Sequence, residues 1–337
     1  MATNRTWILA SRPTGRPTMD NFEMEERDVP EPGPKDVLVK TLYMSVDPYM
    51  RGRMRDAESY AEPWDVGDPM NCGLVGEVVE SKHDRWDAGD VVVGELEWAE
   101  YNLADADELS PVNPDLAPVS TALGVLGMPG RTGYFGVTEI CNPNPGDTMV
   151  VSGAAGAVGS VVGQLGKLAG CRVVGTAGSE EKVEWLTEEL GFDAAINYKE
   201  EDVASALYEA TPDGIDVYFD NVGGEITDAV FTNLNVDARV CICGQIDQYN
   251  ATEVPTGPRK LATLIETRAK VEGLLVRDYS DRYVEATKRL GKLVSQGDIQ
   301  YRETVTEGIE NAPDAFLGLF DGDNIGKQLV RVGERSA

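Results

Sequence analysis

Ten residues at positions 150–159, VVSGAAGAVG, place three glycines directly after a hydrophobic run. The run TMVVSG has the compact apolar pattern of a buried strand, and VGSVVGQLGKLAG has the pattern of a helix. In the G-x-G-x-x-G register, Ala154 takes the first position and Gly156 and Gly159 take the other two. Such a strand-to-helix turn brings backbone N–H groups close to a pyrophosphate at the helix N-terminus, expected near Ala157. We predict a dinucleotide-binding site here; the alternative is that the glycines only permit tight packing.

The end of the second strand of this unit bears on which dinucleotide binds. An NAD site places Asp or Glu about 20 residues after the fingerprint, to bind the ribose 2′-hydroxyl. Here CRVVGTAG is followed by Ser179, and the next cation is Lys182. A lysine and a hydroxyl suit a 2′-phosphate. We therefore expect NADP, although Glu180 and Glu181 stand beside Lys182.

Residues suited to binding zinc are scarce in this chain. Its single histidine, His83, lies in the charged turn SKHDRW, and its five cysteines contain no C-x-x-C pair. Cys241 and Cys243 alternate on one predicted strand and share a face, which suits core or cofactor-lining positions. Two thiols are half of a zinc site, so we predict that no metal takes part.

A hydride donor without a metal can reduce a carbon–carbon double bond conjugated to a carbonyl, because the substrate spreads the arriving charge onto its oxygen. The protein then has to orient the substrate, stabilise the oxyanion and supply a proton.

The pattern along the chain indicates two domains. Residues 36–104 read as short strands punctuated by Gly, Pro and Asp. From about residue 119, helical stretches alternate with compact hydrophobic strands, which predicts a parallel sheet covered by helices. Residues 280–297 have the pattern of an amphipathic helix. The C-terminal GKQLVRVG reads as a strand, and we expect the tail to return to the β-rich first domain.

Composition limits the partners and the compartment. The 337 residues carry 58 Asp plus Glu against 30 Lys plus Arg, a formal charge of −28. Such a chain repels nucleic acid and anionic membranes. The dispersed acid excess suggests a salt-rich cytoplasm; an acidic mesophilic protein is the alternative. The odd number of cysteines fits a reducing compartment, and the N-terminus shows neither a signal peptide nor a membrane anchor. We expect a cytoplasmic protein.

Several motifs together carry a family resemblance. They are DPYMRGRM (47–54), LGVLGMPGRTGY (123–134), AAGAVG (154–159), GCRVVGTAGSEEK (170–182), DNVGG (220–224), CGQIDQYN (243–250) and GDNIGK (322–327). The chain resembles the zinc-independent medium-chain dehydrogenase/reductases, in particular the prostaglandin and leukotriene reductase branch. Within that branch it looks most similar to the bacterial NADPH-dependent curcumin reductases.

The resemblance implies a GroES-like β-rich substrate domain from residues 1–124 and 300–337, and a Rossmann NADP-binding domain with a doubly wound parallel sheet from residues 125–299. It implies NADPH in the cleft between them and a homodimer. It also implies that Lys182 and Tyr198 flank the adenosine phosphate. The implied cofactor contacts are Thr132, Ala155, Gly156, Ala157, Val158, Ser179, Lys182, Tyr198, Asn221, Cys243, Gly244, Gln245, Ile246, Tyr249, Leu274, Leu275, Val276 and Asn324.

Two tyrosines match those thought to hold or protonate the enone in the curcumin-reductase type, Tyr249 and Tyr60. A phenol can donate to an enolate oxygen, so both are candidate catalytic residues; the alternative is that each packs against an aromatic wall. By resemblance, Tyr49, Met50 and Arg51 face the substrate pocket, and plain core is again the alternative.

We therefore predict an NADPH-dependent reductase of the carbon–carbon double bond of α,β-unsaturated ketones or aldehydes. An NADPH:quinone oxidoreductase and a non-catalytic NADPH-binding protein remain as alternatives, because one fold hosts many functions.

Overall fold

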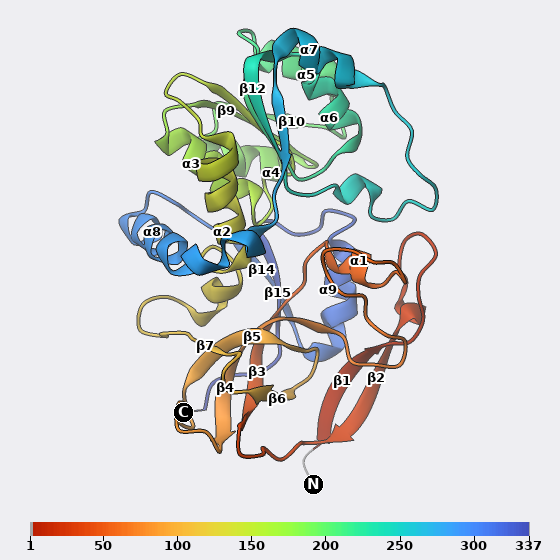
Figure 1. Ribbon diagram of the computed structural model, residues 1–337, viewed down its shortest axis with the longest axis vertical. Coiled ribbons are helices and arrows are strands. Elements are labelled where there is room, and N and C mark those ends of the chain that lie inside the picture. Colours follow the sequence, from red (N-terminus) through yellow and green to blue (C-terminus); the bar gives the residue numbers. More distant parts are fainter. Residues whose placement is uncertain (1–2, 337) are drawn as a thin grey trace. The chain divides into compact units, whose positions relative to one another are not determined.

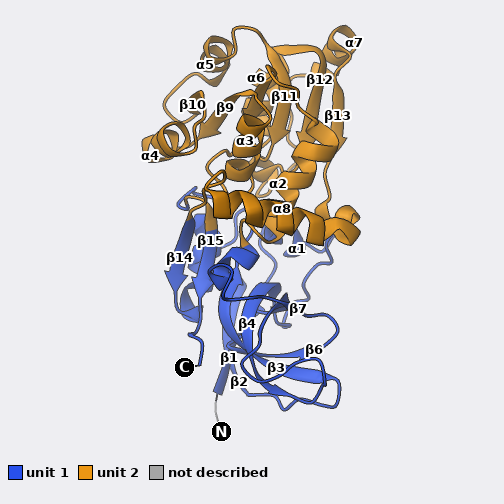
Figure 2. Cartoon of the chain, turned by 90° about the vertical axis from the view of Figure 1, so that its left-hand side faces the viewer, with its two compact units in different colours: residues 1–123, 303–324, 328–337 blue, residues 124–302, 325–327 orange. Residues whose placement is uncertain are grey.

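The computed structural model describes residues 3–336, which form two compact units (Figure 2). Unit 1 is formed by the residues up to 123, by 303–324 and by those from 328 onward, and unit 2 by 124–302 and 325–327. No helix among residues 3–336 is long and apolar enough to cross a membrane.

Unit 1 is built on an open β-sheet with the strand order β14-β15-β3-β4-β5-β7, and β6 pairs with β3. These strands are β3 (Asp36–Ser45), β4 (Asn71–Ser81), β5 (Val91–Glu97), β6 (Tyr101–Asp105), β7 (Ser110–Pro111), β14 (Glu303–Glu307) and β15 (Lys327–Arg331). The pairing of β15 with β3 is antiparallel and sets Leu329 opposite Ser45. The C-terminal strand thus joins the sheet of the β-rich region, as its pattern indicated.

The remaining elements of unit 1 enclose its core. They are the antiparallel pair β1 (Thr3–Leu9) and β2 (Phe22–Asp28), the helices α1 (Met50–Arg53) and α9 (Ala312–Gly318), and the 3-10 turns η1 (Met19–Asn21), η2 (Val119–Leu123) and η8 (Ile309–Asn311). The fully buried Trp98 makes edge-to-face contacts with Trp64 and Phe316, with ring centroids 6.3 Å apart in both pairs. The short helix α1 lies within residues 36–104, where the sequence indicated strands alone.

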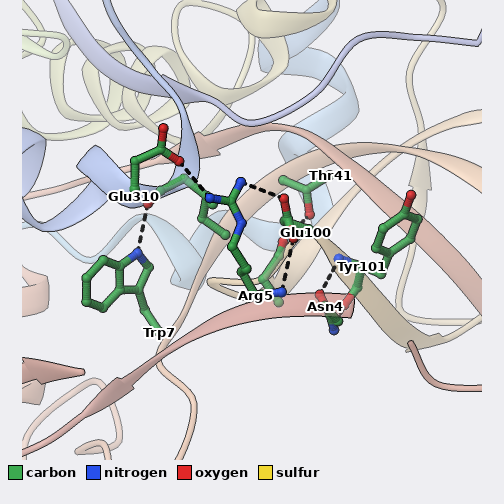
Figure 3. Close-up of polar contacts among 9 residues, drawn as sticks. Asn4, Arg5, Trp7, Thr41, Glu100, Tyr101 and Glu310 are labelled. Atoms are coloured by element: carbon green, nitrogen blue, oxygen red, sulfur yellow. Dashed lines mark hydrogen bonds and ion pairs between the residues drawn. The ribbon is translucent and has the colours of Figure 1, made fainter. Parts of the chain in front are cut away.

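Arg5 on β1 joins two distant parts of unit 1 (Figure 3). Its guanidinium contacts Glu100 at 2.8 Å and Glu310 at 3.1 Å, and its backbone N–H also donates to Glu100. The indole of Trp7 donates to the carbonyl of Ile309 at 2.8 Å. Burial alone would raise the pKa of Glu100, but the hydrogen bonds from Arg5 outweigh it and lower the pKa. Glu100 is thus stabilised as the carboxylate.

Replacing Glu100 by glutamine is expected to lower the free energy of unfolding at pH 7 by about 1 kcal/mol, because the pair is only partly buried. A lowered folded-state pKa gives stability that is present above the unfolded value of about 4.3 and is lost as pH falls through the folded value. The difference between wild type and Glu100→Gln, measured by urea unfolding, should therefore shrink at about pH 3. The exposed Glu25–Arg27 pair supplies the control, Glu25→Gln, with a smaller expected loss. An equal loss at both pH values would contradict this account.

Unit 2 is a six-stranded, wholly parallel sheet with the order β10-β9-β8-β11-β12-β13. Its strands are β8 (Thr148–Val151), β9 (Arg172–Ala177), β10 (Ala194–Asn197), β11 (Ile215–Asp220), β12 (Leu234–Ile242) and β13 (Lys270–Gly273). Numbered within the unit, the order is 3-2-1-4-5-6, which is that of the doubly wound dinucleotide-binding fold.

Helices and helical turns lie before, between and after these strands in the chain (Figure 1). They are α2 (Met128–Phe135), η3 (Gly136–Cys141), α3 (Gly159–Leu168), α4 (Glu180–Glu184), η4 (Trp185–Glu189), α5 (Val203–Ala210), α6 (Gly224–Val230), η5 (Ile246–Gln248), η6 (Lys260–Ala262), α7 (Thr263–Thr267), η7 (Val276–Arg282) and α8 (Tyr283–Gln296). The helix expected to begin near Ala157 begins at Gly159, and the one expected over 280–297 spans Tyr283–Gln296.

Adjacent strand residues of unit 2 point to opposite faces, and both faces are covered. Val151 and Phe219 pack on one face with residues of η3, α3 and η4, whereas Val150 and Tyr218 pack on the other with residues of α5 and α6. Burial on both sides explains why these strands read as continuous hydrophobic runs. The predicted fold class, a Rossmann-type parallel sheet plus a separate β-rich domain, is confirmed.

Candidate functional site

The glycine stretch forms the turn between β8 and α3. Gly153 adopts the left-handed conformation, with φ of 56°. A Cβ added to Gly159 would lie 2.4 Å from the carbonyl oxygen of Gly153 and 2.8 Å from Cα of Ala154. The start of α3 therefore packs directly on the turn, as the fingerprint requires of its last glycine.

Backbone donors of this turn have the arrangement that an anion needs. Within residues 3–336, the N–H groups of Ala155 and Val158 form no hydrogen bond, whereas the parallel bridge between Gly156 and Gly326 directs Ala157 N–H toward the Gly326 carbonyl. They precede the N-terminus of the ten-residue helix α3, which carries partial positive charge. Gly156 has no side chain that could cover these N–H groups. The carbonyl of Ala155 accepts from Gly326 N–H at 2.8 Å, so the 325–327 segment braces the turn.

The carboxyl ends of β9 and β10 hold the residues expected around the adenosine phosphate. Ser179 lies two residues after β9, Lys182 is half-buried in α4, and Tyr198 directly follows β10. The Tyr198 hydroxyl lies over Gly178, 2.7 Å from where a Cβ would stand. Burial, and then the Asp247 carboxylate, raise the pKa of Tyr198, which stays a neutral phenol. Lys199 also approaches Gly178, a cation that the sequence argument missed.

Asn221 and the loop 243–249 lie at the carboxyl ends of β11 and β12. The Asn221 side chain donates to the carbonyl of Ser152 at 2.8 Å, which places it beside the glycine turn. The Tyr249 hydroxyl accepts a 3.4 Å contact from Gln245 N–H and lies over Gly244. Tyr249 and the Asn221 amide thus lie at the same carboxyl edge of the sheet as the glycine turn.

The other predicted cofactor residues of unit 2 lie after β13, in η5 and in α2. Leu274 to Val276 directly follow β13, and Leu274 N–H donates to the carbonyl of Ile242 at 2.9 Å. Ile246 is the first residue of η5. Thr132 is buried in α2, where its hydroxyl donates to Met128 carbonyl at 2.8 Å.

The two cysteines of ARVCICG pack against the same core cluster, Cys241 fully and Cys243 partly buried. Burial raises the pKa of the Cys243 thiol, followed in effect by Cys241 and Asp220, so it is held protonated. No group of three or more His, Cys, Asp or Glu side chains within the described part of the chain is arranged to hold a metal ion.

The predicted residues of unit 1 fall into different environments. Met50 is fully buried in the hydrophobic core, and the buried Arg51 donates to the carbonyl of Gly15 at 2.6 Å. Tyr49 is half-buried, and burial, then Asp47 and Glu95, raise its pKa. Tyr60 is 53% exposed, and Asn324 is half-buried in the loop before β15. Met50 and Arg51 thus have a clear packing role, and a contact with substrate stays a prediction for all three residues of 49–51.

Asp220 lies at this edge and was not among the predicted site residues, although it begins the motif DNVGG. Asp220 is the last residue of β11, and its buried carboxylate accepts six hydrogen bonds. A carboxylate at the end of a parallel strand next to a glycine pair was the available signal. Ser152, which donates to Asp220 at 2.8 Å, was missed as well.

Comparison with known proteins identifies the family to which this chain belongs. Residues 5–112 match the family described as the N-terminal domain of oxidoreductase, and residues 157–292 match the zinc-binding dehydrogenase family. Prostaglandin reductase 1 of Rattus norvegicus is 43% identical over 98% of this chain and 100% of its own. The chain therefore belongs to the medium-chain dehydrogenase/reductases, in the branch that contains the prostaglandin reductases.

Bacterial members are more similar still. NADPH-dependent curcumin reductase of Escherichia coli is 47% identical over 98% of this chain and 97% of its own length. The putative NADP-dependent oxidoreductase YfmJ of Bacillus subtilis is 52% identical over 97% of each chain. The crystal structure of CurA in complex with NADPH from Vibrio vulnificus is 45% identical, with a TM-score of 0.93 over 98% of this chain and 99% of that one. These proteins confirm the resemblance read from the motifs.

Proposed function

We propose that this protein is an NADPH-dependent ene-reductase that acts on α,β-unsaturated ketones and aldehydes. The observation that carries the proposal is the carboxyl edge of the unit 2 sheet, where an anion-binding turn, an amide and a tyrosine gather on adjacent strands. Its relatives support it, because they include a curcumin reductase and the 2-alkenal reductase of Nicotiana tabacum, which is 45% identical over 98% of this chain.

The residues present fit NADPH. The unbonded N–H groups of Ala155 and Val158 suit its pyrophosphate, and Ser179, Lys182 and Tyr198 suit a 2′-phosphate. When bound, NADPH supplies a hydride that adds to the β-carbon of the enone, leaving NADP⁺ and an enolate that takes a proton at its α-carbon.

The chain's own groups would then act on the substrate. A phenol such as Tyr249 or Tyr60 can donate to the carbonyl oxygen and stabilise its developing charge. Tyr249 or water provides the proton at the α-carbon. Orientation of the substrate supplies much of the remaining catalysis.

Oxidation of NADPH and of NADH against a panel of enals, enones and quinones, with each product identified by mass, tests the proposal. We expect saturated carbonyl products with NADPH preferred. Hydroquinones alone would assign the protein to quinone reduction, and tight NADPH binding without turnover would make it a non-catalytic binding protein.

Replacing Lys182 by alanine is expected to raise the KM for NADPH about tenfold or more and to leave that for NADH unchanged, because only NADPH carries the 2′-phosphate. Lys199→Ala, made in parallel, tests the second cation near Gly178. Lys167→Ala is the control, since Lys167 pairs with Asp193 elsewhere in unit 2. An equal rise for NADPH and NADH in Lys182→Ala would assign the lysine to another part of the dinucleotide.

We further propose a homodimer joined through β13. All four residues of this edge strand are exposed. Antiparallel pairing with a second copy, centred on Val271, would set Lys270 opposite Glu272 and so oppose unlike charges. Light scattering at low and high salt measures the assembly.

The acidic surface supports a salt-rich cytoplasm as the working environment. The excess of 28 negative charges repels itself in dilute buffer and is screened by salt. A thermal unfolding midpoint that rises with potassium chloride is the expected result.

A further inference from the structure

The end of β11 contains a hydrogen-bond centre that the proposed reaction does not itself require. Asp220 is fully buried, and its partners are all neutral donors. Its Oδ1 accepts from the hydroxyls of Ser152 and Tyr218, both at 2.8 Å, and from the backbone N–H groups of Val222 at 3.0 Å and Gly223 at 2.9 Å. Its Oδ2 accepts from Thr227 at 2.8 Å and from Gln245 at 2.7 Å.

The hydrogen bonds of Asp220 connect it to two loops at the carboxyl edge of the sheet, the turn 221–223 and the loop 243–249. Ser152 Oγ donates to Asp220 and accepts from Asn221 N–H at 2.8 Å, so a continuous chain of hydrogen bonds fixes Asn221. Gln245 donates to Asp220 and also to the carbonyl of Gly244 at 3.0 Å. The backbone carbonyl of Asp220 accepts from Cys243 and Gly244 N–H groups at 2.8 and 3.1 Å. One residue thus holds the turn 221–223 and the loop 243–249.

We infer that Asp220 is a positioning residue, which orders these two loops so that Asn221, Gly244 and Tyr249 present their groups to the cofactor and substrate. The inference rests on the proposed function, since it names what holds that site together. Burying a carboxylate costs free energy unless it is fully hydrogen-bonded, and six donors meet that requirement here. A carboxylate kept inside the protein at such a cost is explained by the loops it fixes.

The substitution Asp220→Asn tests one contact in particular. The backbone N–H groups of Val222 and Gly223 cannot turn away, so the new amide must keep its oxygen toward them. Its nitrogen then takes the place of Oδ2. The Thr227 hydroxyl can rotate to accept from it. The Gln245 amide is held in its orientation, because its nitrogen donates to the Gly244 carbonyl and its oxygen accepts from Gln248, so its nitrogen meets the new amide donor to donor, 2.7 Å away in the native protein.

Asp220→Asn is therefore expected to raise the equilibrium dissociation constant for NADPH about tenfold, and to raise KM for NADPH more than it lowers kcat. Gln245→Glu alone sets two carboxylates against each other and should weaken binding comparably. The double variant restores a donor facing an acceptor between positions 220 and 245, although it still lacks the donor to the Gly244 carbonyl, and should bind NADPH more tightly than either single variant. The same rescue should appear in the thermal unfolding midpoint of the cofactor-free proteins.

Asp216→Asn is the matched control. Asp216 lies on the same strand and accepts from Thr148 N–H and the Asn235 side chain, both at 2.8 Å, away from the two loops. It should lower stability without changing NADPH affinity. If Asp220→Asn does not fold, Ser152→Ala interrupts the chain to Asn221 with a smaller change, and an unchanged dissociation constant there would overturn the inference.

The outcomes separate the two proposals. If the wild type binds no NADPH, the proposed function fails. If it binds NADPH and Asp220→Asn binds equally well, or if the double variant is no better than the single ones, the positioning role of Asp220 fails and the proposed function stands.

Discussion

Gly159→Ala should weaken NADPH binding at least tenfold and lower the free energy of unfolding by about 1–3 kcal/mol. The added Cβ would lie 2.4 Å from a carbonyl oxygen and 2.8 Å from Cα of Ala154, and both belong to backbone that cannot move aside like a flexible side chain. Either α3 shifts away from the turn or the turn itself changes shape. In both cases the free N–H groups of Ala155 and Val158 leave the positions that suit a pyrophosphate. Equilibrium binding of NADPH and urea unfolding measure the two effects.

Gly291→Ala provides the comparison in the same unit. Gly291 lies inside α8, and an added Cβ would meet only a Leu126 side-chain carbon, at 3.9 Å. Alanine should be neutral there or stabilise the helix by roughly 1 kcal/mol. If Gly159→Ala binds NADPH as tightly as Gly291→Ala does, the turn between β8 and α3 is not the pyrophosphate site.

Tyr249→Phe should lower kcat for enone reduction about 100-fold and change the NADPH dissociation constant little. The phenol oxygen lies over Gly244 and accepts a long, 3.4 Å contact from Gln245 N–H. A hydrogen bond to the developing enolate would be lost at the moment when charge on the carbonyl oxygen is greatest. Single-turnover rates with saturating NADPH isolate this step.

Two further tyrosine variants are compared with Tyr249→Phe. Tyr60→Phe, measured in parallel, shows which phenol contacts the enone. Tyr208→Phe is the control, because Tyr208 on α5 is 70% exposed and lies outside every predicted contact. If Tyr249→Phe and Tyr60→Phe both turn over at the wild-type rate, water supplies the proton and orientation alone accounts for the rate.

Local patterns in the sequence determined the architecture. The hydrophobic runs of β8, β9 and β11 are long enough to specify buried strands, and the helical stretches between them force a parallel sheet. The glycines of the turn are equally informative, because Gly153 takes a left-handed conformation and close backbone packing at Gly159 leaves no room for a side chain. The fold class and the family followed from such features, since each depends on residues near one another in the chain.

Tertiary structure alone decided what surrounds each functional side chain. Asp220, Ser152 and Gln245 are up to 93 positions apart and meet only because β8, β11 and β12 end at one edge of the sheet. The sequence left open whether Met50 and Arg51 pack in the core or face substrate, and only the fold of unit 1 shows that Met50 is buried in its core and that Arg51 donates to the carbonyl of Gly15. Sequence patterns report which residues are apolar or flexible, whereas hydrogen-bond partners depend on long-range packing that no local pattern encodes.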